Sequence, residues 1–240
     1  MLRPRRQIFF AALRAALPLA LLLALVPSSA AQVITSGPRT CPGVALTFDL
    51  CPVRNPVGYD EALVSYLKDN KIPATFFISG RWATKHQDRV KDLQTIPYFE
   101  LGTHGDVHAH LPMHDEAEQR EEIDRATRLM QRQFGVAAPL FRPPFGEYND
   151  LTVQVVKALG LQFILWDVVS GDPDPTLSAV NIIERVTKRV RPGSIVVMHA
   201  NGKGKHTREL VQALHERILE QKRLRPMTVS ELLDCREKRP

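Results

Sequence analysis

The stretch GTHGDVHAHL, residues 102–111, concentrates side chains that can bind a metal ion or move a proton. His104 and His108 are four residues apart, and two imidazoles at that spacing can reach one ion from a helical turn or a tight loop. We therefore interpret this pair as metal ligands. His110 and His114 extend past the pair toward the next expected helix, so we expect them to be solvated.

Groups suited to acid and base chemistry follow apolar segments elsewhere. Asp49 closes the run VALTFD, where a carboxylate must be either functional or paired with a cation. Arg142, in FRPPFG, is the natural cation because a guanidinium can hold a carboxylate with two hydrogen bonds. His199 follows GSIVVM and could exchange a proton near neutral pH, with Asp172 orienting its other ring nitrogen. The structural alternatives are an ordinary core salt bridge between Asp49 and Arg142, and a hydrogen-bonded rim histidine without a catalytic role at His199.

These residues need elements that bring them together. Seven apolar segments have the length of strands, at 44–49, 74–78, 98–102, 139–143, 161–167, 194–198 and 225–229. Amphipathic stretches separate them, most clearly at 115–134, 150–159 and 206–221. This alternation predicts an α/β fold with a parallel sheet, most economically an irregular, TIM-like (β/α)7 barrel, with a doubly wound open sheet as the alternative. Loops at the strand ends would then carry the chemistry.

The first 31 residues differ from the rest of the chain. Three arginines precede an apolar run whose cleanest part is 15–26, and small residues follow up to Ala31. This order is typical of a secretory signal peptide, with an uncleaved anchor as the alternative, and the Arg5-Arg6 pair also permits twin-arginine export. We therefore expect a signal peptide at 1–31, a catalytic barrel at 32–240, and a secreted or periplasmic protein without an integral membrane domain after cleavage.

The basic charge of the chain lies largely in that leader. The sequence has 32 Lys and Arg against 26 Asp and Glu, and removal of the four arginines in 1–31 leaves 28 against 26. No basic stripe remains to bind nucleic acid. We expect a monomer.

The three cysteines predict one disulfide in an oxidising compartment. Cys41 precedes the first apolar run and Cys235 is expected in the last short helix, so a bond between them would tie the chain ends together. Cys51 would lie at the far end of the extended run 44–49 and remain a free thiol. Three unpaired buried cysteines are the alternative.

Five segments in this order resemble the motifs of the polysaccharide deacetylase family, carbohydrate esterase family four, which includes the nodulation-type chitooligosaccharide deacetylases. The segments are LTFDLCP, GTHGDVHAHL, FRPPFG, WDVVSGD and IVVMH, and the resemblance runs from about Val44 to Leu233. It implies an irregular barrel of about seven strands. It also implies a hydrolase that uses a divalent metal to remove acetyl groups from the N-acetylated sugars of a polysaccharide or oligosaccharide.

The resemblance assigns a role to each matched residue. Asp49 would be the general base, Arg142 would hold it, and His199 would be the general acid tuned by Asp172. His104 and His108 would bind the metal, for which we expect zinc first and cobalt or nickel as alternatives. The backbone N–H of Phe145 would stabilise an oxyanion. Tyr148 and Trp82 are the aromatic residues that could stack on sugars, although Trp82 is expected to be buried in the core.

Two positions depart from the family pattern. The first motif usually has two adjacent aspartates, a base and then a metal ligand, and Leu50 occupies the second place. Asp49 could itself bind the metal, Asp106 could substitute although a surface turn is its expected place, or the metal could be held weakly or not at all. Pro173 stands where the family usually has a tryptophan. A noncatalytic carbohydrate-binding barrel and an amidase for small amides are the competing interpretations.

Overall fold

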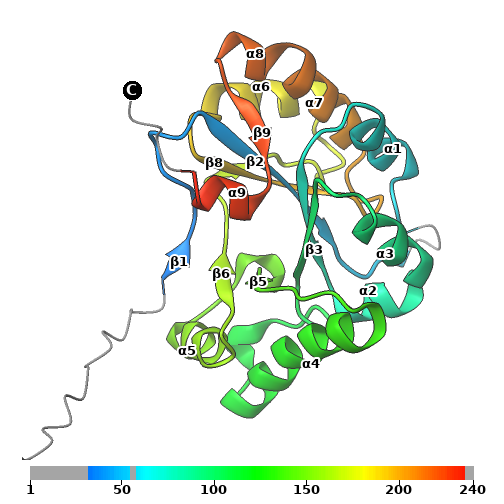
Figure 1. Cartoon of the computed structure of the whole chain (residues 1–240), viewed down its shortest axis with the longest axis vertical. Coiled ribbons are helices and arrows are strands. Elements are labelled where there is room, and N and C mark those ends of the chain that lie inside the picture. Colours follow the sequence, from blue (N-terminus) through cyan, green and yellow to red (C-terminus); the bar gives the residue numbers. More distant parts are fainter. Residues whose placement is uncertain (1–31, 55–57, 236–240) are drawn as a thin grey trace, which may run out of the picture. The chain divides into compact units, whose positions relative to one another are not determined.

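The computed structural model describes residues 32–54 and 58–235, which form a curled sheet with helices packed around it (Figure 1). The expected signal peptide lies outside the described residues. The strands are β1 (Val33–Ile34), β2 (Gly43–Leu50), β3 (Ala74–Ile78), β4 (Phe99–Thr103), β5 (Leu140–Phe141), β6 (Gln162–Ile164), β7 (Val168–Val169), β8 (Ser194–His199) and β9 (Arg225–Met227). The α-helices are α1 (Glu61–Asp69), α2 (Gly80–Lys85), α3 (Gln87–Gln94), α4 (Glu116–Phe134), α5 (Asp150–Ala158), α6 (Ala179–Arg189), α7 (Thr207–Ala213), α8 (Leu219–Gln221) and α9 (Val229–Leu233). None of the helices in this part of the chain is long and apolar enough to cross a membrane.

The sheet is parallel and nearly closes on itself. Its strand order is β1-β6-β5-β4-β3-β2-β8-β7, with β9 also paired to β2, and each of these neighbouring pairs is parallel. β6 and β7 lie near opposite ends of this order, yet only residues 165–167 connect them. So short a connection requires the two ends of the sheet to approach each other. The expected irregular (β/α)7 barrel is therefore confirmed, in preference to an open doubly wound sheet.

The predicted elements agree with the structure where their sequence pattern is long or apolar. Helix α4 begins after the N-cap Asp115, whose side chain forms a capping box with Glu118, and it ends at Gly135 in the left-handed conformation. Strand β3 has the predicted bounds. Strands β1 and β7, which have two residues each, were not predicted. Cys235 lies two residues beyond α9 and not within it.

Strand β2 separates two apolar layers. Its residues Val44, Leu46, Phe48 and Leu50 belong to the larger core cluster, which packs between the sheet and the surrounding helices. The alternate residue Ala45 belongs to a second cluster inside the barrel, with residues of β3, β5, β6 and β8. Successive side chains of a strand point to opposite faces, so Asp49 shares the interior face with Ala45.

The amino end of the barrel interior is closed by helix α9 and the segment that contains Cys41. Val229 and Leu232 of α9 pack in the interior cluster together with Cys41, and Cys41 is disulfide-bonded to Cys235. The predicted disulfide is thus confirmed, and Cys51 is the buried free cysteine. With the amino end filled by apolar side chains, the carboxyl end of the barrel remains available for polar groups.

Candidate active site

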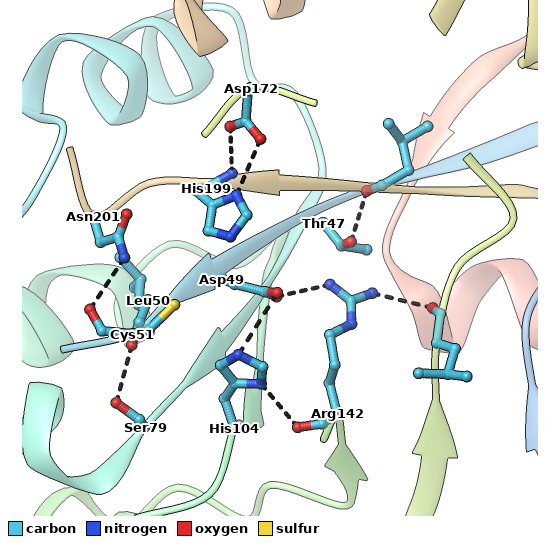
Figure 2. Close-up of polar contacts among 12 residues, drawn as sticks. Thr47, Asp49, Leu50, Cys51, Ser79, His104, Arg142, Asp172, His199 and Asn201 are labelled. Carbon is cyan, nitrogen blue, oxygen red and sulfur yellow. Dashed lines mark hydrogen bonds and ion pairs between the residues drawn. The ribbon is translucent and has the colours of Figure 1, made fainter. Parts of the chain in front are cut away.

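A cavity of about 290 Å³ opens at the carboxyl ends of the strands. Its lining includes six side chains singled out in the sequence, Asp49, His104, His108, Phe145, Asp172 and His199, together with Cys51, Trp166 and Lys203. Asp49 and His199 are direct neighbours in the register of β2 and β8, so these two groups come from adjacent strands. Figure 2 shows Asp49 between His199 on one side and His104 on the other. The predicted groups therefore do meet at one rim of the barrel.

Asp49 is held as a buried carboxylate by Arg142. Nη1 of Arg142 donates to Oδ1 of Asp49 over 2.8 Å, and Nη2 donates to the carbonyl of Leu165 over 3.2 Å. Burial alone would raise the pKa of Asp49, but the positive charge and the hydrogen bond of Arg142 lower it below the ordinary value. Asp49 is therefore ionised at neutral pH, which a general base requires.

His104 has one ring nitrogen available for a ligand. Its Nδ1 lies 2.8 Å from the backbone carbonyl of Arg142. A carbonyl only accepts hydrogen bonds, so Nδ1 carries the proton and Nε2 keeps its lone pair. Nε2 lies 3.7 Å from Oδ2 of Asp49. Burial lowers the pKa of His104, so the ring is neutral, which is the protonation state that binds metals.

His108 lies beside His104 and has an unusual backbone conformation. Its φ of 68° lies in the left-handed region, and its ring contacts those of His104 and Phe145 at centroid distances of 4.9 and 4.3 Å. Burial, reinforced by the neighbouring His104, lowers the pKa of His108 to about 3. The ring is thus a neutral donor at any physiological pH. A strained backbone conformation that persists in a site is evidence of a functional constraint.

Cys51 completes a group of three possible metal ligands. Ligand atoms of Cys51, His104 and His108 all lie within 4.8 Å of one another. Sulfur and imidazole nitrogen are donors that zinc prefers, and a catalytic zinc site has three protein ligands and one open position. The donor set therefore fits the divalent metal that the sequence leads us to expect. Cys51 was predicted only as a free thiol, although its position two residues after Asp49 places both side chains on the same side of an extended chain.

His199 and Asp172 form a second buried pair. Nδ1 of His199 lies 3.0 Å from Oδ1 of Asp172, and the His199 backbone N–H donates to Oδ2 over 2.8 Å. Hydroxyls of Ser170 and Thr207 also donate to this carboxylate, over 2.8 and 2.7 Å. Burial would lower the pKa of His199, but the hydrogen bond and charge of Asp172 raise it above the ordinary value. The ring is oriented with Nε2 free to exchange a proton.

Asp106 does not occupy the surface turn that the sequence suggested. Its side chain is buried, and one carboxylate oxygen lies 3.2 Å from Nε of Arg125. It does not line the cavity. Asp106 therefore braces the loop against helix α4 and is not positioned to replace the missing ligand.

The other highlighted residues lie around the site. His110 pairs with Glu147 at 2.7 Å and stacks on Phe145, while His114 pairs with Glu118 at 3.1 Å, and both are partly exposed as expected. Tyr148 is partly exposed, contacts the edge of Phe163 at a centroid distance of 5.2 Å, and does not line the cavity. Trp82 is buried, as expected, and donates to the carbonyl of Gly58. Pro173 lines the cavity wall.

Fold and site together define a (β/α)7-type barrel with a cluster of carboxylates, histidines and a cysteine in the cavity at its carboxyl rim. The family model for polysaccharide deacetylases matches residues 36–164, and the chain belongs to this family. The earlier resemblance is thereby confirmed.

Two named relatives illustrate the breadth of the family. The chain is 30% identical to a peptidoglycan-N-acetylglucosamine deacetylase of Bacillus cereus over 183 residues, 76% of this chain and 64% of that protein. It is 32% identical to a chitooligosaccharide deacetylase of Sinorhizobium fredii over 164 residues, 66% of this chain and 72% of that protein. The chain thus spans slightly less than two thirds of the Bacillus cereus relative.

A solved structure shares the fold. It is described as a pseudoenzyme of carbohydrate esterase family four from Bacillus anthracis, with a TM-score of 0.76 and 24% identity, covering 85% of this chain and 69% of that one. This similarity concerns the fold alone.

Proposed function

We propose that this protein is a metal-dependent hydrolase that removes acetyl groups from the N-acetylated sugars of a polysaccharide. The observation that carries the proposal is the placement of an ionised Asp49 and an Asp172-oriented His199 on adjacent strands, beside two neutral histidines that share one cavity. A base, an acid and metal donors within one cavity are the parts needed for amide hydrolysis. A noncatalytic binding barrel would have no need to keep a buried base and a buried acid.

The residues divide the reaction between them. A bound divalent metal supplies Lewis acidity toward the acetyl oxygen and the attacking water. Asp49, kept ionised by Arg142, accepts a proton from that water. The backbone N–H of Phe145 is proposed to donate to the oxyanion that develops, as an oxyanion donor does. His199 gives the proton on Nε2 to the departing amine nitrogen, while Asp172 stabilises the charged ring. Tyr148 is proposed to contact the sugar outside the cavity.

The proposal extends to metal and location. Zinc is the preferred metal, with cobalt and nickel as alternatives, because imidazole donors suit all three. We propose a signal peptide at 1–31, a barrel at 32–240 and a secreted or periplasmic monomer. The Cys41–Cys235 disulfide supports this location because disulfides persist mainly in oxidising compartments.

Acetate release tests the function. Protein purified without chelator is expected to release acetate from N-acetylglucosamine oligomers, to stop after chelation, and to recover with zinc, cobalt or nickel. Simple acetamides serve as the comparison substrates. Release only from the simple amides would identify a small-amide amidase. Metal-loaded protein that binds the oligomers and releases no acetate would identify a noncatalytic carbohydrate-binding barrel and overturn the proposal.

Asp172→Asn is expected to narrow the pH range of activity. His199 must be protonated to act as the acid, so activity falls as the pH rises through the His199 pKa, which Asp172 raises. An asparagine has no charge, so this fall should move to lower pH. The profile of kcat against pH measures it. Asp174→Asn is the matched control, because Asp174 lies in the same loop, is exposed and bonds to Thr176. An unchanged alkaline limb in Asp172→Asn would contradict the assignment of His199 as the acid.

A further inference from the structure

The position next to the base cannot supply a metal ligand in this chain. Leu50 is an apolar side chain, and it packs in the core cluster between the sheet and the helices, fully buried. It does not line the cavity. His104 and His108 alone would leave a divalent ion with two protein ligands, one short of the number typical of catalytic zinc.

The side chain of Cys51 lies at the cavity, and the backbone that carries it is held in place. This side chain is 2% exposed and lines the cavity. The backbone around it is held from two sides. Nδ2 of Asn201 donates to the Cys51 carbonyl over 3.1 Å, and the hydroxyl of Ser79 donates to the Leu50 carbonyl over 3.2 Å (Figure 2). The sulfur is therefore presented by a fixed backbone.

The spacing of the donors also suits one ion. Zinc bonds of about 2.3 Å to sulfur and about 2.0–2.1 Å to nitrogen place tetrahedral ligand atoms roughly 3.3–3.6 Å apart. The three donor atoms here lie within 4.8 Å of one another, so movements of about 1 Å would bring them to that geometry. Side-chain rotations alone can supply a movement of this size.

We propose that Cys51 is the third metal ligand and binds a zinc-class ion as a thiolate together with His104 and His108. The inference rests on the proposed function for the identity of the cavity as the reaction site. A thiolate carries the same single negative charge as the missing carboxylate, so the charge of the ligand set is preserved. It also leaves Asp49 free of the metal, with both oxygens available to Arg142 and to water. Sulfur shifts the preference of the site toward zinc and cobalt and away from magnesium and calcium.

Cobalt substitution gives a direct readout of the thiolate. The chain has three cysteines, and Cys41 and Cys235 are bonded to each other, so Cys51 is the remaining thiol. Any sulfur-to-cobalt charge-transfer absorption in the near ultraviolet must then come from Cys51. We expect this absorption in the wild-type protein titrated with Co²⁺, together with visible bands of tetrahedral cobalt. The binding of each metal ion should also release one proton, because a free thiol is protonated near neutral pH.

Three variants complete the test. Cys51→Ala should bind Co²⁺ more than about 100-fold more weakly than wild type. Losing a residue that only supports a ligand weakens metal binding by about 10–100-fold, so a larger loss indicates a ligand. Cys51→Asp should restore binding without the charge-transfer band. Cys41→Ser combined with Cys235→Ser should keep the band, which identifies its source. Thermal unfolding of each metal-free variant separates ligand loss from misfolding.

The outcomes distinguish this inference from the proposed function. Cobalt bound to wild type without the band, or with full affinity in Cys51→Ala, would overturn the ligand assignment and leave the deacetylase proposal standing. The band without acetate release from any substrate would overturn the deacetylase proposal and keep Cys51 as a ligand. Failure of the wild-type protein to bind cobalt, nickel or zinc would overturn both.

Discussion

Asp49→Asn is expected to lower kcat for acetate release by about 10²–10⁴-fold, the usual contribution of general acid–base catalysis. An amide of the same shape keeps the cavity but cannot accept the proton of the attacking water. The change also leaves Arg142 charged and buried beside a neutral partner. Removing one partner of a buried ion pair costs about 3–5 kcal/mol, so the free energy of unfolding should fall as well. Steady-state kinetics and denaturant unfolding measure the two effects.

Asp167→Asn is the control for loss of a hydrogen-bonded carboxylate outside the cavity, because Asp167 contacts the amino end of strand β8. Asp167 accepts hydrogen bonds from Arg39, Ser194 and the Ile195 backbone, and it does not line the cavity. This variant should lose stability and keep kcat. A folded Asp49→Asn protein with kcat within tenfold of wild type would show that Asp49 is not the base.

His104→Ala and His108→Ala should each abolish metal retention. Each change removes one of the donors of the cavity, and His104 is also fixed by its bond to the Arg142 carbonyl. Zinc content of protein purified without chelator should drop from near stoichiometric to background. Calorimetric titration should show a loss in affinity of more than about 100-fold, beyond the effect of losing a supporting residue.

His110→Ala provides the control from the same loop. His110 points to Glu147 and stacks on Phe145, outside the group of three donors. It should keep full metal content. Stoichiometric zinc in either His104→Ala or His108→Ala would show that the metal does not bind in this cavity, whatever the activity of the variant.

The fold was predictable where a single physical effect dominates the sequence. Strand β3 is an uninterrupted apolar run, and helix α4 has a capping box, an apolar stripe and a terminal glycine. Both were located from these signals. Strands β1 and β7 have two residues each, too few for any periodicity, and exist because neighbouring strands offer them hydrogen bonds.

The sequence pointed to Asp49, His104, His108 and His199 as residues of one site, and they do line one cavity, but it did not point to Cys51. Polar side chains that end apolar strands are conspicuous, which is how Asp49 and His199 were found. The role of Asp106 was missed because its partner, Arg125, lies 19 positions along the chain and on another element. Cys51 was missed because buried cysteine is ordinary in a core, and only the tertiary structure brings it near His104 and His108.

Because Cys41 pairs with the distant Cys235, the order in which the chain is synthesised affects whether Cys51 stays free to bind a metal. The two cysteines are 194 positions apart, and Cys51 follows Cys41 after ten. A chain delivered amino end first into an oxidising compartment therefore exposes Cys41 and Cys51 together long before Cys235 arrives. Their premature pairing would consume the free thiol in the cavity and leave Cys235 unmatched. Under the proposed export and metal binding, maturation should accordingly depend on disulfide exchange, and zinc supplied in the oxidising compartment should raise the yield of the correctly paired form.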